Sequence, residues 1–215
     1  MRMFARRTHP DATQSTGRLE AFTDGVFAIA ATLLVLDLTS HSIGTVASDG
    51  DLLAGLRDMS GLFLNFVLSF VLLCLLWMTH TQQFENVARV DGVIVWLNNA
   101  RLLFIVLIPF VTGLTTEYSA FLIGRVVMPV TFFFAVVISW LQWMWACRHR
   151  ERMLPDLTDV QAAAIGRAGL SAAIISVAVI ALSTVAGSIA FVLFFLDPVV
   201  TRLLQRGLPR DSAAS

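Results

Sequence analysis

Long apolar runs recur along the whole chain, and they constrain its fold more than any other feature. A membrane-spanning helix needs about 20 mostly apolar residues. Runs of this kind lie at residues 19–38, 62–79, 90–114, 126–147, 167–182 and 187–204. Charged residues make up only 14% of the chain, against roughly 25% in soluble domains. We therefore predict an all-α integral membrane protein with six transmembrane helices.

The division between the last two spans depends on a turn inside one long apolar stretch. Residues 162–204 are too many for a single crossing. Ser183, Thr184 and Gly187 lie close together near the middle of this stretch, and they mark the expected turn.

The arginines predict the orientation of the chain. Twelve of the fifteen basic residues fall in the two tails and in the second and fourth connections between spans. Only Arg57 and Arg125 fall in the other connections, and Arg101 lies inside the third span. Basic residues accumulate on the cytoplasmic side of membrane proteins, so we expect both termini to be cytoplasmic. The expected organisation is a cytoplasmic tail at 1–16, a six-helix transmembrane domain at 17–206 and a cytoplasmic tail at 207–215.

Several functional classes have no support in the sequence. The net charge is zero, which argues against a nucleic-acid partner. The sequence contains no HExxH or GxSxG motif, so an enzyme is not expected and we expect no cofactor. Cys74 and Cys147 lie in or beside apolar runs, and we interpret them as reduced core residues rather than a disulfide or metal pair.

Polar residues inside the spans are candidates for function because burying them in lipid is costly. Asp24 lies near the start of the first span, His80 near the end of the second, and Asn98 about two turns into the third. All three therefore share the cytoplasmic third of the membrane. They predict either a structural polar clasp or a site for protons or ions.

One face of the first span carries a stripe of apolar, small and hydroxyl residues. At about 100° per residue, the stripe consists of Phe22, Gly25, Ile29, Thr32, Leu33 and Leu36. Asp24 and Glu20 fall on the far side, where we expect them to point into the bundle. On periodicity alone, such a stripe faces lipid or a packed core more often than a pore.

A motif at the start of the first span resembles the transmembrane protein 175 family of potassium channels. The motif is an Arg, three residues, then Phe-Ser/Thr-Asp, which here is Arg18, Phe22, Thr23 and Asp24. Later segments are also similar to bacterial members of the family: Trp77, His80, Asn98 and the run IPFVTGL at 108–114. The resemblance covers about the first half of the chain, and the remaining spans match only in hydropathy.

The resemblance implies a homotetramer in which the first helix of each subunit lines a central pore. It implies a pore constriction at Ile29, Leu33 and Leu36, and selection of transiently bound potassium at Thr32. Ala28 stands where a serine can occur, which we expect to weaken selectivity.

The resemblance also implies roles for the polar and aromatic residues of the first three spans. It implies an inter-helix network of Arg18, Asp24, His80 and Asn98, and packing of the motif through Phe22 and Trp77. The expected function is a potassium-selective channel of the bacterial plasma membrane, gated by the hydrophobic constriction, whose partners are the lipid bilayer and potassium ions. A proton-permeable channel, a secondary transporter using Asp24, His80 and Asn98, and a scaffold without flux stay open as alternatives.

Overall fold

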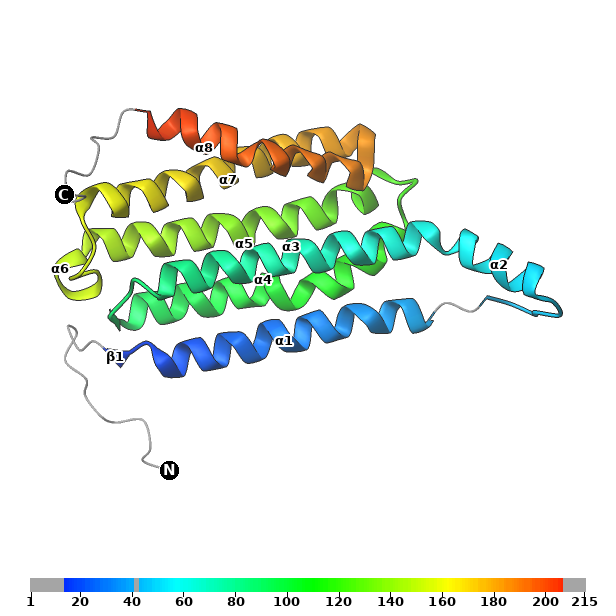
Figure 1. The fold of residues 1–215 in the computed structure, drawn as a ribbon, viewed down its shortest axis with the longest axis horizontal. Helices are drawn as coiled ribbons and strands as arrows, with labels where there is room; N and C mark the ends of the chain where they lie inside the picture. Colours follow the sequence, from blue (N-terminus) through cyan, green and yellow to red (C-terminus); the bar gives the residue numbers. More distant parts are fainter. Residues whose placement is uncertain (1–13, 41–42, 207–215) are drawn as a thin grey trace, which may run out of the picture.

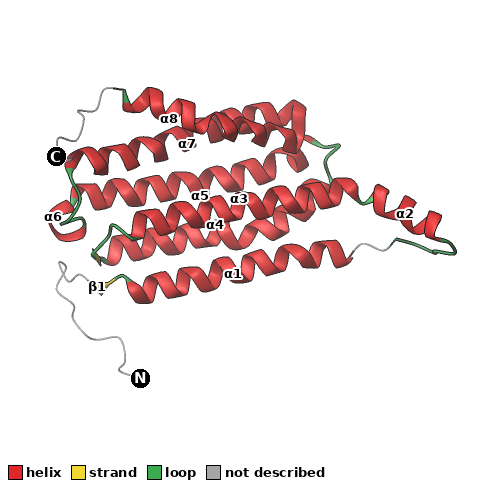
Figure 2. Ribbon diagram, viewed as in Figure 1, coloured by secondary structure: helices red, strands yellow, loops and turns green. Residues whose placement is uncertain are grey.

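The computed structural model describes residues 14–40 and 43–206. Residues 1–13 of the predicted N-terminal tail and the whole predicted C-terminal tail, residues 207–215, lie outside the described residues. The described chain is almost entirely helical, as Figure 2 shows. Long helices lie side by side in a bundle (Figure 1). They are α1 (Gly17–Ser40), α3 (Ser60–Phe84), α4 (Gly92–Glu117), α5 (Leu122–Arg148) and α7 (Asp159–Ala186).

Five stretches of the described chain are long and apolar enough to cross a membrane. Four of them are α1, α3, α4 and α5, and each overlaps one predicted span. The fifth runs from Asp159 to Gln205, a length of 47 residues. At 1.5 Å per residue a straight helix of that length would be about 70 Å long, more than twice the hydrocarbon thickness of a bilayer.

This fifth stretch folds back on itself at Gly187. The helix α7 ends at Ala186, and Gly187 adopts a positive φ of 57°, a conformation that residues with a side chain rarely adopt. The chain then returns as a 3₁₀ helix, η1 (Gly187–Leu196), followed by α8 (Asp197–Gln205). Arg167 donates to the Leu204 carbonyl at 2.7 Å, and Gln205 donates to the Ala164 carbonyl at 3.0 Å, so the two segments are antiparallel (Figure 1).

The start of α7 lies eight residues before the predicted span at 167–182. The hydroxyl of Thr158 accepts from the Gln161 backbone N–H, and the Gln161 side chain accepts from the Thr158 backbone N–H. This capping box satisfies two backbone donors at the helix start. The capping box explains why α7 begins in a polar segment, which hydropathy alone left outside the predicted span.

One end of the bundle is tied together by short-range contacts between connections. Residues Gln14–Ser15 (β1) pair antiparallel with Arg89–Val90 (β2), which fixes the start of α1 to the α3–α4 connection. Asp91 caps α4 by accepting from the Ile94 backbone N–H at 2.8 Å, and its other oxygen accepts from Trp145 at 3.0 Å. The short helix α6 (Arg150–Met153) lies at the same end (Figure 1).

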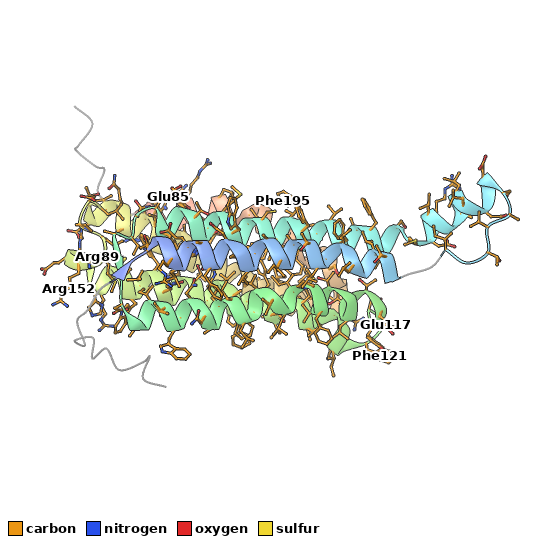
Figure 3. The ribbon with its side chains drawn as sticks, turned by 90° about the horizontal axis from the view of Figure 1, so that it is seen from below. Glu85, Arg89, Glu117, Phe121, Arg152 and Phe195 are labelled. Atoms are coloured by element: carbon orange, nitrogen blue, oxygen red, sulfur yellow. The ribbon has the colours of Figure 1, made fainter. Side chains whose placement is uncertain are left out.

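The two ends of the bundle carry different residues. Figure 3 shows Arg89 and Arg152 at one end, and Glu117 and Phe121 at the other. The start of α1 and the end of α8 lie at the arginine-rich end (Figure 1). The opposite end carries α2 (Asp49–Asp58), which projects beyond the bundle within the connection between α1 and α3.

Candidate functional site

The helix α1 contacts the rest of the bundle through one face only. Its buried residues Thr23, Phe27, Ala30 and Leu34 recur at intervals of four, three and four, the spacing of one helical face. This face packs against α3 and α4. The side chains of Phe27, Ala30 and Leu34 belong to the main hydrophobic core of the protein.

The opposite face of α1 is uncovered in the single chain. It carries the predicted stripe, in which Phe22, Ile29, Leu33 and Leu36 are 57%, 60%, 41% and 56% exposed. Gly25, Ala28 and Thr32 are exposed as well. A row of large apolar side chains on the outside of a membrane bundle can face either lipid or another subunit.

The hydroxyl of Thr32 is oriented by its own helix. It donates to the Ile29 carbonyl at 2.8 Å. Because the only hydroxyl proton is used in this bond, the lone pairs of the oxygen are left for an acceptor role. Thr32 therefore offers a negatively polarised oxygen on the exposed face, one turn beyond Ile29.

Polar contacts join α4 to both of its neighbours, to the buried face of α1 through Asn98 and to α3 through Arg101. The Asn98 amide donates to the Thr23 hydroxyl at 2.8 Å, and both residues are fully buried. Three residues further along α4, Arg101 contacts His80 Nδ1 at 3.1 Å and donates to the Leu76 carbonyl at 2.6 Å. Both of these partners of Arg101 belong to α3.

Arg101 is a fully buried cation inside the membrane bundle. Its guanidinium lies over the Phe27 ring, 5.7 Å from the ring centroid, within the range of a cation–π contact. The His80 ring packs against Phe84 with centroids 4.2 Å apart. The cation therefore joins α1, α3 and α4 at the level of the polar residues.

Asp24 and Arg18 lie outside this buried group. Asp24 accepts from the Trp77 indole N–H at 2.9 Å, in a contact between α1 and α3 that is exposed in the single chain. This placement differs from the expected inward direction, because the face of α1 that meets the bundle is centred on Thr23 and Phe27 rather than on Asp24. Arg18 is exposed near the start of α1.

A small cavity of about 60 Å³ lies between Asp24 and His80. Asp24, Glu20 and His80 line it, and His80 Nε2 is buried without a protein hydrogen-bond partner among the described residues. The cavity has the volume of about two water molecules in liquid water. The four residues of the predicted network therefore do not all touch, but Asp24 and His80 share one polar cavity.

Sequence reasoning assigned no role in the network to Thr23, although it belongs to the motif. Its position on the helix gave a signal, because it lies about 180° from Thr32 at 100° per residue. The sequence places Arg101 inside the third span, where the transporter alternative would group it with Asp24 and His80, and the structure shows its direct contact with His80. Among the described residues, no cluster of histidine, cysteine and acidic side chains could hold a metal ion.

Comparisons with known proteins identify relatives of this chain. The family model described as endosomal/lysosomal potassium channel TMEM175 matches residues 18–109. A potassium channel of Chamaesiphon minutus is 34% identical over 146 residues, which cover 67% of this chain and 71% of that protein. The endosomal/lysosomal proton channel TMEM175 of Danio rerio is 35% identical over 114 residues, which cover 51% of this chain and 22% of that protein.

The fold comparison extends the similarity to the C-terminal half. A crystal structure of a lysosomal potassium-selective channel TMEM175 homolog from Chamaesiphon minutus superposes with a TM-score of 0.69 and 26% identity. The superposition covers 89% of this chain and 98% of that one. These relatives are ion channels, a class that carries out no catalysis and needs no cofactor. The chain therefore belongs to the TMEM175 potassium channel family.

Proposed function

We propose that the chain is a potassium-selective channel of the bacterial plasma membrane, a homotetramer in which α1 of each subunit lines the pore. The observation that carries this proposal is that α1 packs against the bundle through one face and leaves the other face uncovered. One face is held by α3 and α4, while the stripe from Phe22 to Leu36 is uncovered. Around a shared axis, that stripe would form the wall of a passage, and relatives named potassium channels support this assignment.

The proposed subunit crosses the membrane six times with both termini in the cytoplasm. The segment η1 has 10 residues and α8 has 9, which together span about 33 Å at the rises of 3₁₀ and α helices. That length matches a hydrocarbon core of about 30 Å, so η1 and α8 form the sixth crossing. The arginine-rich end of the bundle is the cytoplasmic side under the positive-inside rule.

Ile29 forms the constriction in this proposal. It lies about 18 Å from the Gly17 end of α1 and about 16 Å from the Ser40 end, near the middle of the membrane. A ring of such side chains gates by dewetting, since ions cannot cross a neck too narrow to hold water. Leu33 and Leu36 extend the apolar wall toward the extracellular end.

Thr32 supplies the selectivity in this proposal. Its hydroxyl proton is bonded to the Ile29 carbonyl, so its oxygen can accept a partly dehydrated potassium ion. Ala28, on the other side of Ile29, has no hydroxyl and adds no second oxygen ligand. We therefore expect only a modest preference for potassium over sodium.

The inter-helix polar groups set the rotation of α1 in this proposal. The Thr23–Asn98 and Asp24–Trp77 bonds hold α1 at two points on different sides of its buried face. His80 and Arg101 fix the position of α3 relative to α4. Rotation of α1 about these contacts would widen or narrow the Ile29 ring.

A proton-permeable channel is a second candidate, because animal relatives are named proton channels. A secondary transporter has less support. It would need Asp24, His80 and Asn98 in one coupling site, whereas Asp24 bonds Trp77 and Asn98 bonds Thr23.

Replacing Ile29 with Asn tests the constriction. We expect Ile29→Asn channels in liposomes to pass potassium faster than the wild type and to discriminate less against sodium, because a polar ring stays hydrated. Ile123→Asn, at a residue 77% exposed on the outside of α5, is the matched control and should leave the flux unchanged. Flux in Ile29→Asn equal to that of the wild type would rule out Ile29 as the neck.

A further inference from the structure

A second cavity lies within the bundle, away from α1. Its volume is about 270 Å³, and residues of α3, α5, α7, η1 and α8 line it. No residue of α1 or α4 takes part in its lining, so it is separate from the proposed ion pathway. Its volume is slightly below the roughly 300–1,000 Å³ of ordinary small-molecule sites.

Asp197 lines this cavity at the start of α8. Ser171 donates to its Oδ1 at 2.7 Å, and no basic side chain among the described residues forms an ion pair with it. Asp197 lies about 12 Å from the Gln205 end of α8. In the six-crossing arrangement proposed above, on which this inference rests, that depth is within the hydrocarbon region.

A carboxylate at that depth needs a compensating cation. Acidic side chains inside spanning helices are costly, and they almost always pair with another group or face a cavity. Ser171 supplies one hydroxyl donor to this carboxylate, whereas an ionised carboxylate has sites for several donors or a cation. A cation bound in the adjoining cavity would supply the missing partner.

The other walls of the cavity determine which cation fits. Phe132, Trp140 and Phe194 contribute aromatic rings. The Trp140 N–H is already bonded to the Gly166 carbonyl at 3.0 Å, so this residue offers its ring rather than its donor. Aromatic rings attract organic ammonium ions, whereas calcium requires six to eight oxygen ligands, which these walls do not provide.

Two further polar side chains of the cavity are already satisfied by the protein. Ser139 donates to Gln83 Oε1 at 3.0 Å, and Thr79 donates to the Leu75 carbonyl at 2.9 Å. Asp197 is therefore the charged group that a ligand would meet. Leu75 and Pro198 lie on the lining and are exposed on the surface of the bundle, which gives entry from the lipid phase.

We infer that this cavity binds a lipophilic ammonium ion, with the charged nitrogen at Asp197 and the hydrocarbon body against Phe132, Trp140 and Phe194. The ligand class is a protonated amine with a compact apolar body. Such molecules partition into the bilayer and can reach the opening between Leu75 and Pro198.

The test uses 1-adamantylamine as the cationic probe and 1-adamantanol as a neutral probe of the same shape. We expect saturable binding of the amine to the purified full-length protein, at least tenfold weaker binding of the alcohol, and at least tenfold weaker amine binding in Asp197→Asn. Asp58→Asn, on the exposed α2, is the matched control and should bind like the wild type. Equal binding of both probes would show an apolar cavity only and would overturn the inference.

A second variant keeps the test decisive if Asp197→Asn does not fold. Phe194→Ala retains the carboxylate and removes one aromatic wall, and we expect it to bind the amine about threefold to tenfold more weakly. Unchanged amine binding in Phe194→Ala, or in folded Asp197→Asn, would contradict the proposed site. Binding needs no ion flux, so Ile29→Asn should bind the amine normally even if it refutes the proposed constriction.

Discussion

Two threonines on α1 allow its two faces to be tested separately. Thr23 and Thr32 are nine residues apart, which places them about 180° apart around the helix. Thr23 is fully buried and accepts from Asn98 at 2.8 Å. Thr32 is exposed and bonds only within its own helix, to Ile29.

We expect Thr23→Val to lower stability by about 1–2 kcal/mol. Valine keeps the shape but removes the acceptor, and Asn98 Oδ1 already lacks a partner among the described residues. An unpaired buried donor costs about 1–3 kcal/mol, although hydrogen bonds between membrane helices average only about 0.6 kcal/mol, with a maximum near 1.7. The corresponding fall in Tm is about 2–8 °C for a chain of this length.

Thr32→Val should show the opposite pattern. It breaks a bond within one helical turn and leaves packing unchanged, so we expect a stability change within about 0.5 kcal/mol. It removes the oxygen proposed to receive potassium, so the ratio of potassium to sodium flux should fall. Thermal unfolding in one detergent and cation flux in liposomes measure both properties for both variants. Equal losses of Tm in the two variants, or lost selectivity in Thr23→Val, would refute the assignment of the faces.

Two other contacts give independent predictions. Asp24→Ala removes the acceptor for Trp77, so we expect a lower yield of the proposed tetramer on size-exclusion chromatography, with unchanged selectivity. Asp24→Asn keeps an acceptor oxygen and should assemble better, and wild-type yield from Asp24→Ala would count against the role of this contact. Arg101→Met leaves His80 Nδ1 and the Leu76 carbonyl without their donor, which should cost about 2 kcal/mol in thermal unfolding, while exposed Arg57→Met should cost nothing measurable. Equal Tm values for these two arginine variants would show that the buried cation does not stabilise the bundle.

Hydropathy predicted the positions of most of the long apolar helices, because lipid imposes a length and a composition on every span. It did not predict the start of α7, because the Thr158–Gln161 capping box lies in a polar segment. It located the reversal near Gly187, where the structure has a positive φ. The 3₁₀ geometry of η1 has no signal in hydropathy, since an apolar run of 10 residues is equally compatible with an α-helix.

Side-chain partners were harder to predict than helix positions. Helix periodicity predicted which residues share the face of α1 with Ile29, because this grouping depends only on the angle of about 100° per residue. It could not show that Arg101 rather than Asp24 lies beside His80, since that depends on the relative rotation of α3 and α4. Trp77 was expected to pack at the motif, but its bond to Asp24 required coordinates.

If the uncovered face of α1 surrounds an aqueous ion pathway, a cysteine on that face should react with a water-soluble thiol reagent during conduction. In a background with Cys74 and Cys147 replaced by Ala, Thr32→Cys would be treated with a positively charged thiol reagent during potassium flux. Val185→Cys, at a residue 77% exposed on α7, serves as the lipid-facing control. We expect the reagent to block flux through Thr32→Cys and to leave flux through Val185→Cys unchanged. A Thr32→Cys channel that stays unlabelled and conducts normally after treatment would show that this face of α1 does not line the ion pathway.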